Sequence, residues 1–417
     1  MTTVDELAAR TPRSRDRVVD LLRAASICVV VVGHWTVGFV IWDGGVIRTV
    51  NAVGMSSYLW LATWVFQVMP IFFFVGGFSN MVALDAFRRR GGSTGAFIRS
   101  RLERLLRPSL LFLGVWAAVQ LALHLFDVGT PTGPHLWGDV TLLRGMKPPG
   151  ATLPFGPLWF LGVYLVVVTI SPWTVTVHRR FRWKVIAAMG IGAVLADAVG
   201  FGTGVWEWRW SNVVFVLLLP HQLGHFYADG TLARLPRTVP WAMVVGGLGG
   251  LLVLTNPPLW QLFGDARFEW FPGIGAYPKS LLGTDVELVS NAYPPTVCFL
   301  LGGVWTIGAV VLARPALSRW LERPRPWKAT IRLNAVIMTL FLWHMTAFLL
   351  AVLTLWPLGF GGQTDTDARW WLERPLWIAV SAAYLAVLVA IVGRVERPVV
   401  PTPATSTVGA TAEPRGG

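Results

Sequence analysis

The sequence predicts an all-α, polytopic membrane protein, a bundle of about ten transmembrane helices. Three observations carry this prediction: 54% of the residues are hydrophobic, only 14% are charged, and long apolar segments alternate with polar loops along the 417 residues. A soluble protein has about 25% charged residues. An apolar segment that crosses a hydrocarbon core of about 30 Å finds no water for its backbone amides, so each segment must be helical.

Ten apolar segments are long enough to be taken as spans, and the fifth and sixth are the shortest. The third begins directly after Pro108, where we expect an interruption, because proline has no backbone N–H to donate. In chain order the predicted spans are residues 18–41, 58–84, 109–126, 158–177, 185–199, 212–226, 239–254, 295–312, 331–355 and 376–392.

The basic residues predict the orientation of the bundle. An even number of spans places both termini on one side, and the loops of that side, with Asp20, Arg23 and Arg332 at the span ends, hold 27 basic and 10 acidic residues, a net charge of +17. The opposite side holds 8 basic and 12 acidic residues, a net charge of −4. Basic loops stay in the cytoplasm, so both termini are expected there and the protein in the cell membrane. Membrane topology thus accounts for the total of +13, and no nucleic-acid partner is implied.

The sequence predicts a cytoplasmic tail (1–17), a membrane domain (18–392) and a small, Pro-rich cytoplasmic tail (393–417) that we expect to be disordered. The first apolar run is too long for a cleaved signal peptide. We expect the long outer loop, 255–294, to be functional or to re-enter the membrane in part. The two cysteines, Cys28 and Cys298, lie in apolar runs, which excludes a disulfide framework.

Arg23 and His34 are the notable ionisable residues of the first span. Eleven residues on a helix turn through 1100°, about 20° beyond three full turns, so the two side chains share a face with about 16 Å between their Cα atoms. Asp20 lies within about 40° of the same line. Arg23 can be a snorkelling anchor at the interface, and His34 can be a neutral packing residue. The functional alternative for His34 is a general base on a hydroxyl.

A cationic stripe precedes the third span. Arg101, Arg104 and Arg107 follow one another at intervals of three, with Arg99 nearby, so on a helix they form one ridge at the cytoplasmic surface. Guanidinium forks suit phosphate groups, although any cytoplasmic loop is rich in basic residues.

These motifs resemble the acyltransferase-3 family of integral membrane acyltransferases. The run "RAASICVVVVGH" (23–34) is similar to the family's Arg-x10-His arrangement, "MPIFFFVGGF" (69–78) to its second-span signature, and "RLERLLRP" (101–108) to its RxxR element. "PLWFLGVYL" (157–165) and "FLWHM" (341–345) are weaker similarities. It is open whether Arg101 with Arg104, or Arg104 with Arg107, matches RxxR. We expect no extracytoplasmic esterase-like domain, which some relatives carry after the last span.

The resemblance implies transfer of a short acyl group, often acetyl, from acyl-CoA to a hydroxyl of an envelope glycan, a glycolipid or a secreted metabolite. The resemblance implies acyl-CoA as the donor substrate, and it implies no metal. His34 would act as general base or as a covalent acyl relay, and Arg23 would orient the donor or stabilise charge. Arg101, Arg104 and Arg107 would bind its phosphates.

Three further histidines and a pair of glycines in the predicted spans allow more than one interpretation. His221 and His225 are i, i+4 neighbours that can form interhelical hydrogen bonds, line the donor cavity or, less simply, share a metal. His344 in the ninth span either approaches His34 or packs. Gly76 and Gly77 permit close helix contact or leave room for an acyl chain.

The alternative function is a proton-coupled transporter or flippase for a sugar, lipid or drug, with His34 and His344 as proton relays. Such transporters commonly have carboxylates near the midplane of the membrane, and the central parts of the predicted spans contain no Asp or Glu.

Overall fold

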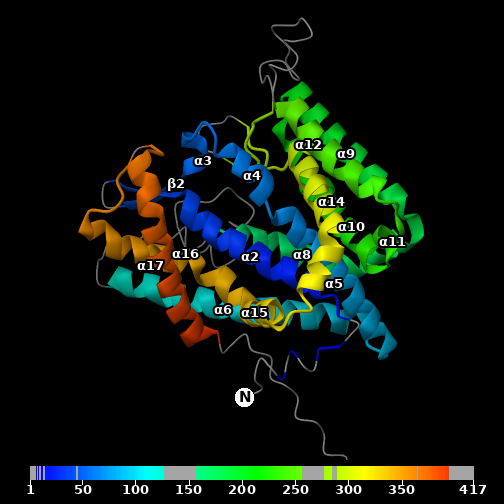
Figure 1. Ribbon diagram of the computed structural model, residues 1–417, viewed down its shortest axis with the longest axis horizontal. Coiled ribbons are helices and arrows are strands. Elements are labelled where there is room, and N and C mark those ends of the chain that lie inside the picture. Colours follow the sequence, from blue (N-terminus) through cyan, green and yellow to red (C-terminus); the bar gives the residue numbers. More distant parts are fainter. Residues whose placement is uncertain are drawn as a thin grey trace, which may run out of the picture.

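The computed structural model describes residues 6, 8, 11–12, 15–43, 46–125, 156–255, 277–283, 289–363 and 365–393. These residues form a bundle of long helices (Figure 1). The predicted all-α class is confirmed. Residues 394–417 of the predicted tail, and 256–276 and 284–288 of the predicted outer loop, lie outside the described residues.

Each of the ten predicted spans coincides largely with a helix. In the described part of the chain, eight candidate spans are long and apolar enough to cross a membrane. They are α2 (Arg17–Val37), α4 with α5 (Trp60–Phe66 and Met69–Arg89), α8 (Leu158–Phe181), α9 (Trp183–Thr203), α12 (Thr238–Thr255), α14 (Val297–Trp320), α16 with the short η4 (Ile337–Leu355 and Trp356–Leu358) and α17 (Ala368–Val392). The other two predicted spans are α6 (Thr94–Leu125) and α10 (Asn212–Ala228).

Pro108 does not interrupt α6, so this expectation is wrong. The helix continues from Thr94 to Leu125 with Pro108 inside it. A proline removes one backbone hydrogen bond, and a helix within a membrane bundle tolerates this loss where side chains satisfy the neighbouring carbonyls. Pro108 leaves the Arg104 carbonyl without its helical donor, and the Ser109 hydroxyl donates a hydrogen bond of 2.7 Å to the next carbonyl oxygen, that of Leu105.

Several predicted boundaries also differ from the structure, and at two of them the predicted span runs into a different element. Helix α2 ends at Val37, and the chain continues into an antiparallel hairpin of β1 (Gly38–Asp43) and β2 (Val46–Asn51) rather than helix. Residues 331–335 belong to a separate amphipathic helix, α15 (Pro324–Ala335), and α16 begins only at Ile337. The remaining short elements are α3 (Ala52–Met55), η3 (Trp206–Ser211) and α11 (Thr231–Arg234).

Helices α5 and α10 pack closely at two glycines. A Cβ on Gly77 would overlap the backbone carbonyl of His221, and a Cβ on Gly224 would overlap the carbonyl oxygen of Phe74. Small residues allow helix backbones to approach in a membrane, where dispersion contacts and hydrogen bonds drive association. Gly77 therefore permits close helix contact. This packing also fixes Ser79 and Asn80, just beyond Gly77, in the interior of the bundle.

Candidate functional site

Arg23 and His34 both face the interior of the bundle from α2. The Asp16 carboxylate caps the helix by accepting hydrogen bonds from the amides of Val18 and Val19, which fixes where its first turn begins. The Arg23 guanidinium donates to the Ser79 hydroxyl of α5 at 2.6 Å. It also lies 3.6 Å from the Asp20 carboxylate. Arg23 is therefore held by side chains of the protein, which a simple snorkelling anchor does not require.

His34 lies directly against His344 of α16, which decides between the two readings of His344. The His34 Nδ1 is 2.8 Å from the His344 Nε2, and the two rings stack with centroids 5.1 Å apart and planes 13° apart. The indole N–H of Trp35 donates to the backbone carbonyl of His344 at 2.9 Å. Together these contacts join α2 to α16 deep in the bundle.

The hydrogen bonds around this pair assign the positions of its protons. The His344 Nδ1 lies 2.6 Å from the carbonyl oxygen of Phe341, and a carbonyl can only accept, so Nδ1 carries the hydrogen. In the neutral ring the His344 Nε2 is then an acceptor, and the His34 Nδ1–H donates to it. Neutral His34 is left with an unprotonated Nε2, which is the basic nitrogen a proton acceptor needs.

Arg101 converges on the same stretch of α5 as Arg23. Its guanidinium donates to the Ser79 carbonyl at 3.1 Å and to the Asn80 side-chain oxygen at 3.4 Å. Arg104 is exposed, yet it interacts electrostatically with both Arg23 and Arg101. Arg23, Arg101 and Arg104 act on one another electrostatically, and the one neighbouring carboxylate, Asp20, pairs with Arg23 and more closely with Arg15. The site therefore carries excess positive charge, which suits an anion.

Arg107 is exposed on the outer surface of α6. The interior contacts of Arg101 and the electrostatic reach of Arg104 distinguish these two from Arg107 within the predicted stripe. Arg99 is also exposed and pairs with Glu103 at 2.7 Å. The spacing alone did not predict which of these arginines contacts the interior of the bundle, because that depends on how α6 packs against α5.

A row of aromatic rings leads to the histidine pair from Tyr164, which interacts electrostatically with Arg23 and Arg101. The Tyr164 ring lies against Gly76, where a Cβ would be 3.1 Å from its Cε2, and it stacks on Phe160 of the same helix with centroids 6.0 Å apart. The Phe160 ring is 5.9 Å from that of Phe341, which in turn lies 6.3 Å from the His344 ring. Neither Phe160 nor Tyr164 was predicted for the site, although their i, i+4 spacing within "PLWFLGVYL" was a signal.

His221 and His225 are fully buried and hydrogen-bond between helices. The Asn80 amide group lies 3.4 Å from the His221 Nε2, and the His225 Nδ1 donates to the Gly77 carbonyl oxygen at 3.0 Å. Asn80 thus links His221 to Arg101. Within the described ranges, no three His, Cys, Asp or Glu residues are grouped as metal ligands.

His178 belongs to the same buried region and was missed because it follows the predicted end of the fourth span by one residue. Its ring lies 2.8 Å from the Gln222 amide nitrogen and 3.2 Å from the Asp229 carboxylate. Burial would raise the pKa of Asp229, but hydrogen bonds from Thr231, His178 and Arg182 outweigh burial and hold this pKa below its usual value. These contacts tie α8 to the end of α10 and describe a structural role.

Comparison with known proteins gives one family. A family model described as an acyltransferase domain matches residues 16–394, which is nearly the whole chain. No curated protein and no solved structure matches. The matched range contains all eight residues predicted for the site, from Arg23 to His344.

Proposed function

The chain belongs to the acyltransferase-3 family of membrane acyltransferases, and from this premise we propose that it moves a short acyl group from acyl-CoA to a hydroxyl. The acceptor is an envelope glycan, a glycolipid or a secreted metabolite. Acetyl is the proposed group. The protein is a multi-pass membrane protein, and we place it in the cell membrane with both termini in the cytoplasm, as the distribution of basic residues favours.

The arginine cluster supports acyl-CoA as donor. Arg23, Arg101 and Arg104 lie at the basic end of the bundle, where a cytoplasmic polyanion would arrive. Charge-assisted hydrogen bonds from guanidinium groups to phosphate are among the strong ones. Arg101 and Arg104 would bind the phosphates of coenzyme A. Arg107, which faces outward, would contribute to long-range attraction only.

The observation that carries the proposal is the His34–His344 pair. The unprotonated His34 Nε2 takes the proton of the acceptor hydroxyl while the hydroxyl oxygen forms its bond to the thioester carbon. The carbon–sulfur bond then breaks, and the thiolate of coenzyme A takes the proton back from the imidazolium. His344 acts as a positioning residue, because its hydrogen bond to the Phe341 carbonyl holds His34 in the Nδ1–H tautomer.

A covalent route uses the same nitrogen. The His34 Nε2 would attack the thioester carbon, and the carbon–sulfur bond would break. The thiolate would leave, and the acyl group would stay on the imidazole. The acceptor hydroxyl would then attack this acyl-imidazole. As the C–N bond breaks, the hydroxyl proton would pass to the freed His34 Nε2 and from there to the thiolate of coenzyme A. The ridge of α2 carries Arg23 about 16 Å from His34 along the helix axis, a span that the pantetheine arm would bridge past the Tyr164 and Phe160 rings. Arg23 would orient this arm near the phosphates.

The proposed function is tested with radioactive acetyl-CoA in membranes that contain the protein, with an ionophore present to remove ion gradients. Label is expected to enter the membrane or acceptor fraction while free thiol appears in equal amount. A transporter would leave the thioester intact and would need the gradient to move its cargo. Acyl transfer would be contradicted if thiol release required the ion gradient. It would also be contradicted if membranes with the protein released no more thiol than membranes without it.

Arg101→Ala is expected to raise the KM for acetyl-CoA by roughly 10-fold and to change kcat little, because a hydrogen bond between a charged group and a phosphate contributes about 1.5–3 kcal/mol. Initial rates of thiol release over a range of acetyl-CoA concentrations measure this effect. Arg99→Ala is the matched control, since Arg99 is exposed on the same helix and pairs with Glu103. Equal KM values for the two variants would remove Arg101 from the donor site.

A further inference from the structure

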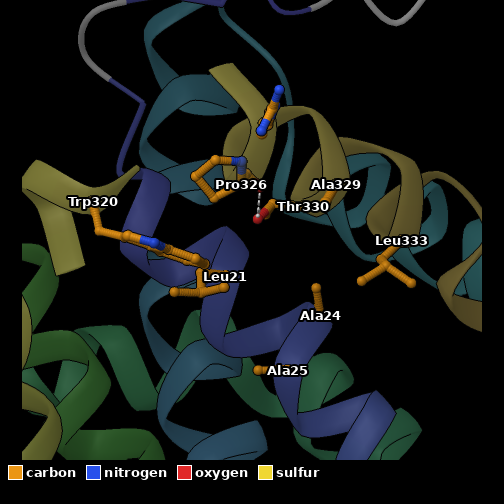
Figure 2. A pocket seen from close by; sticks show the side chains of 9 residues that line it. Leu21, Ala24, Ala25, Trp320, Pro326, Ala329, Thr330 and Leu333 are labelled. Atoms are coloured by element: carbon orange, nitrogen blue, oxygen red, sulfur yellow. Dashed lines mark hydrogen bonds between the residues drawn. The ribbon is translucent and has the colours of Figure 1, made fainter. Parts of the chain in front are cut away.

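A groove opens on the side of α2 that faces away from the proposed reaction. It has a volume of about 490 Å³ and lies between α2, the end of α14 and the amphipathic helix α15. Figure 2 shows Leu21 and Ala24 of α2 facing Ala329 and Leu333 of α15, with the Trp320 indole at one side. The lining is almost wholly apolar.

Beyond the groove, exposed apolar side chains form a track along the same face of α2. At 100° per residue, Leu21, Ala25 and Val32 lie within about 40° of one another, whereas Arg23 and His34 lie on nearly the opposite face. Ala25 is exposed and Val32 is 44% exposed. From Leu21 to Val32 the track rises about 16 Å, roughly half of the hydrocarbon core of a bilayer. This length fits an acyl chain that lies in one leaflet.

Positively charged side chains border the groove at the end nearer the predicted cytoplasmic side. Arg325 is one of the lining residues, and it lies on α15 beside Lys328 and Arg332, all within about 60° around the helix. Trp320 is 43% exposed next to them, a place where indoles commonly mark the boundary between lipid and water. An apolar track that ends in a basic rim between helices matches the chemistry of an anionic phospholipid, with its chains below and its phosphate at the rim.

We propose that this groove binds one anionic phospholipid. One acyl chain lies between α2 and α15 and follows Ala25 toward Val32, and the phosphate pairs with Arg325. A donor thioester in this groove would be remote from His34, because the groove and the Arg23–His34 ridge are on opposite faces of α2. The proposal therefore concerns a second ligand, and it holds whether or not the protein transfers acyl groups.

The test compares phosphatidylglycerol with phosphatidylcholine of the same acyl chains. The purified protein in mild detergent is mixed with each lipid, and native mass spectrometry counts the molecules retained while thermal unfolding reports stabilisation. The wild type is expected to retain one phosphatidylglycerol and to gain thermal stability from it. Arg325→Glu should weaken this binding by roughly ten-fold, because a basic residue near a lipid headgroup contributes a factor of about five and the reversed charge repels. Ala25→Trp, which fills the groove, should prevent retention.

Two control variants separate the groove from general effects at the basic end. Arg237→Glu reverses an exposed charge in the loop before α12, and Ala187→Trp enlarges an exposed alanine near the start of α9. Both should retain phosphatidylglycerol as the wild type does. The proposal is overturned if phosphatidylcholine is retained equally, if Arg237→Glu weakens binding as much as Arg325→Glu, or if inorganic phosphate gives the same stabilisation as the lipid. No acyl transfer is measured, so its failure is distinct from failure of the proposed function.

Discussion

The His34→Ala variant is expected to lose acyl transfer, with kcat lower by roughly 10³-fold, because a positioned general base contributes about 10² to 10⁴ in rate. The structure gives the physical reason. The His34 Nδ1 is committed to His344, so only its Nε2 can accept the hydroxyl proton, and alanine offers no substitute. Thiol release and label transfer from radioactive acetyl-CoA, in membranes with equal amounts of each protein, measure the loss.

The control is Thr36→Ala on the same helix. Thr36 lies two residues beyond His34 and is partly exposed, and its hydroxyl donates to the Val32 carbonyl one turn back. Its removal should leave both folding and rate near the wild type. Matched gel-filtration profiles of the two variants would show that any difference in rate is chemical. If His34→Ala retains wild-type rates at equal abundance, His34 is not the base and the proposed mechanism is wrong.

The His34→Ala variant also helps to distinguish general-base catalysis from the covalent acyl-imidazole route. Wild-type protein quenched after brief exposure to labelled acetyl-CoA without acceptor should carry protein-bound label only if the His34 nitrogen forms an acyl-imidazole. His34→Ala should then carry none. Absence of bound label on an active wild type would favour direct attack by the hydroxyl with His34 as general base.

The local part of the site could be predicted from the sequence because it lies on a single helix. The eleven-residue spacing of Arg23 and His34 fixes a shared face for any straight α-helix, and the structure keeps both on α2. The contact between His34 and His344 depends on how α2 packs against α16, across 310 residues of sequence. Periodicity within one segment carries no information about that packing, so the sequence left the role of His344 open.

The same limit explains which details of the fold were wrong. Hydropathy measures how long an apolar run is, and it does not distinguish the end of a helix from an apolar strand that follows, as at Val37 and β1. It also joined the end of α15 to α16, since Ile331 and Leu333 are apolar although they belong to an amphipathic helix. Pro108 was read by its intrinsic effect on an isolated helix, whereas packing in the bundle keeps α6 continuous.

The His344→Ala variant is expected to lower kcat by about 100-fold with little change in the KM for acetyl-CoA, because the ring contacts the base and lies apart from the arginine cluster. Without the His344 Nε2, the His34 Nδ1–H loses its acceptor, and the imidazole is free to rotate or to adopt the other tautomer. Its basic nitrogen then no longer points reliably at the hydroxyl. Initial rates over a range of acetyl-CoA concentrations separate the two constants.

A purely structural role for His344 would give a different pattern, and two further variants distinguish the two. His344→Gln keeps an oxygen that can accept from the His34 Nδ1–H, so it should recover part of the kcat that alanine loses. Met345→Leu changes a buried neighbour of similar volume, and it should leave kcat and KM near the wild type if packing alone is not the cause. If glutamine gives no more activity than alanine, or if Met345→Leu lowers kcat equally, the hydrogen bond between the two histidines does not position the base. If His344→Gln recovers part of kcat and Met345→Leu has no effect, α16 contributes to the reaction by accepting the hydrogen bond from the His34 Nδ1–H.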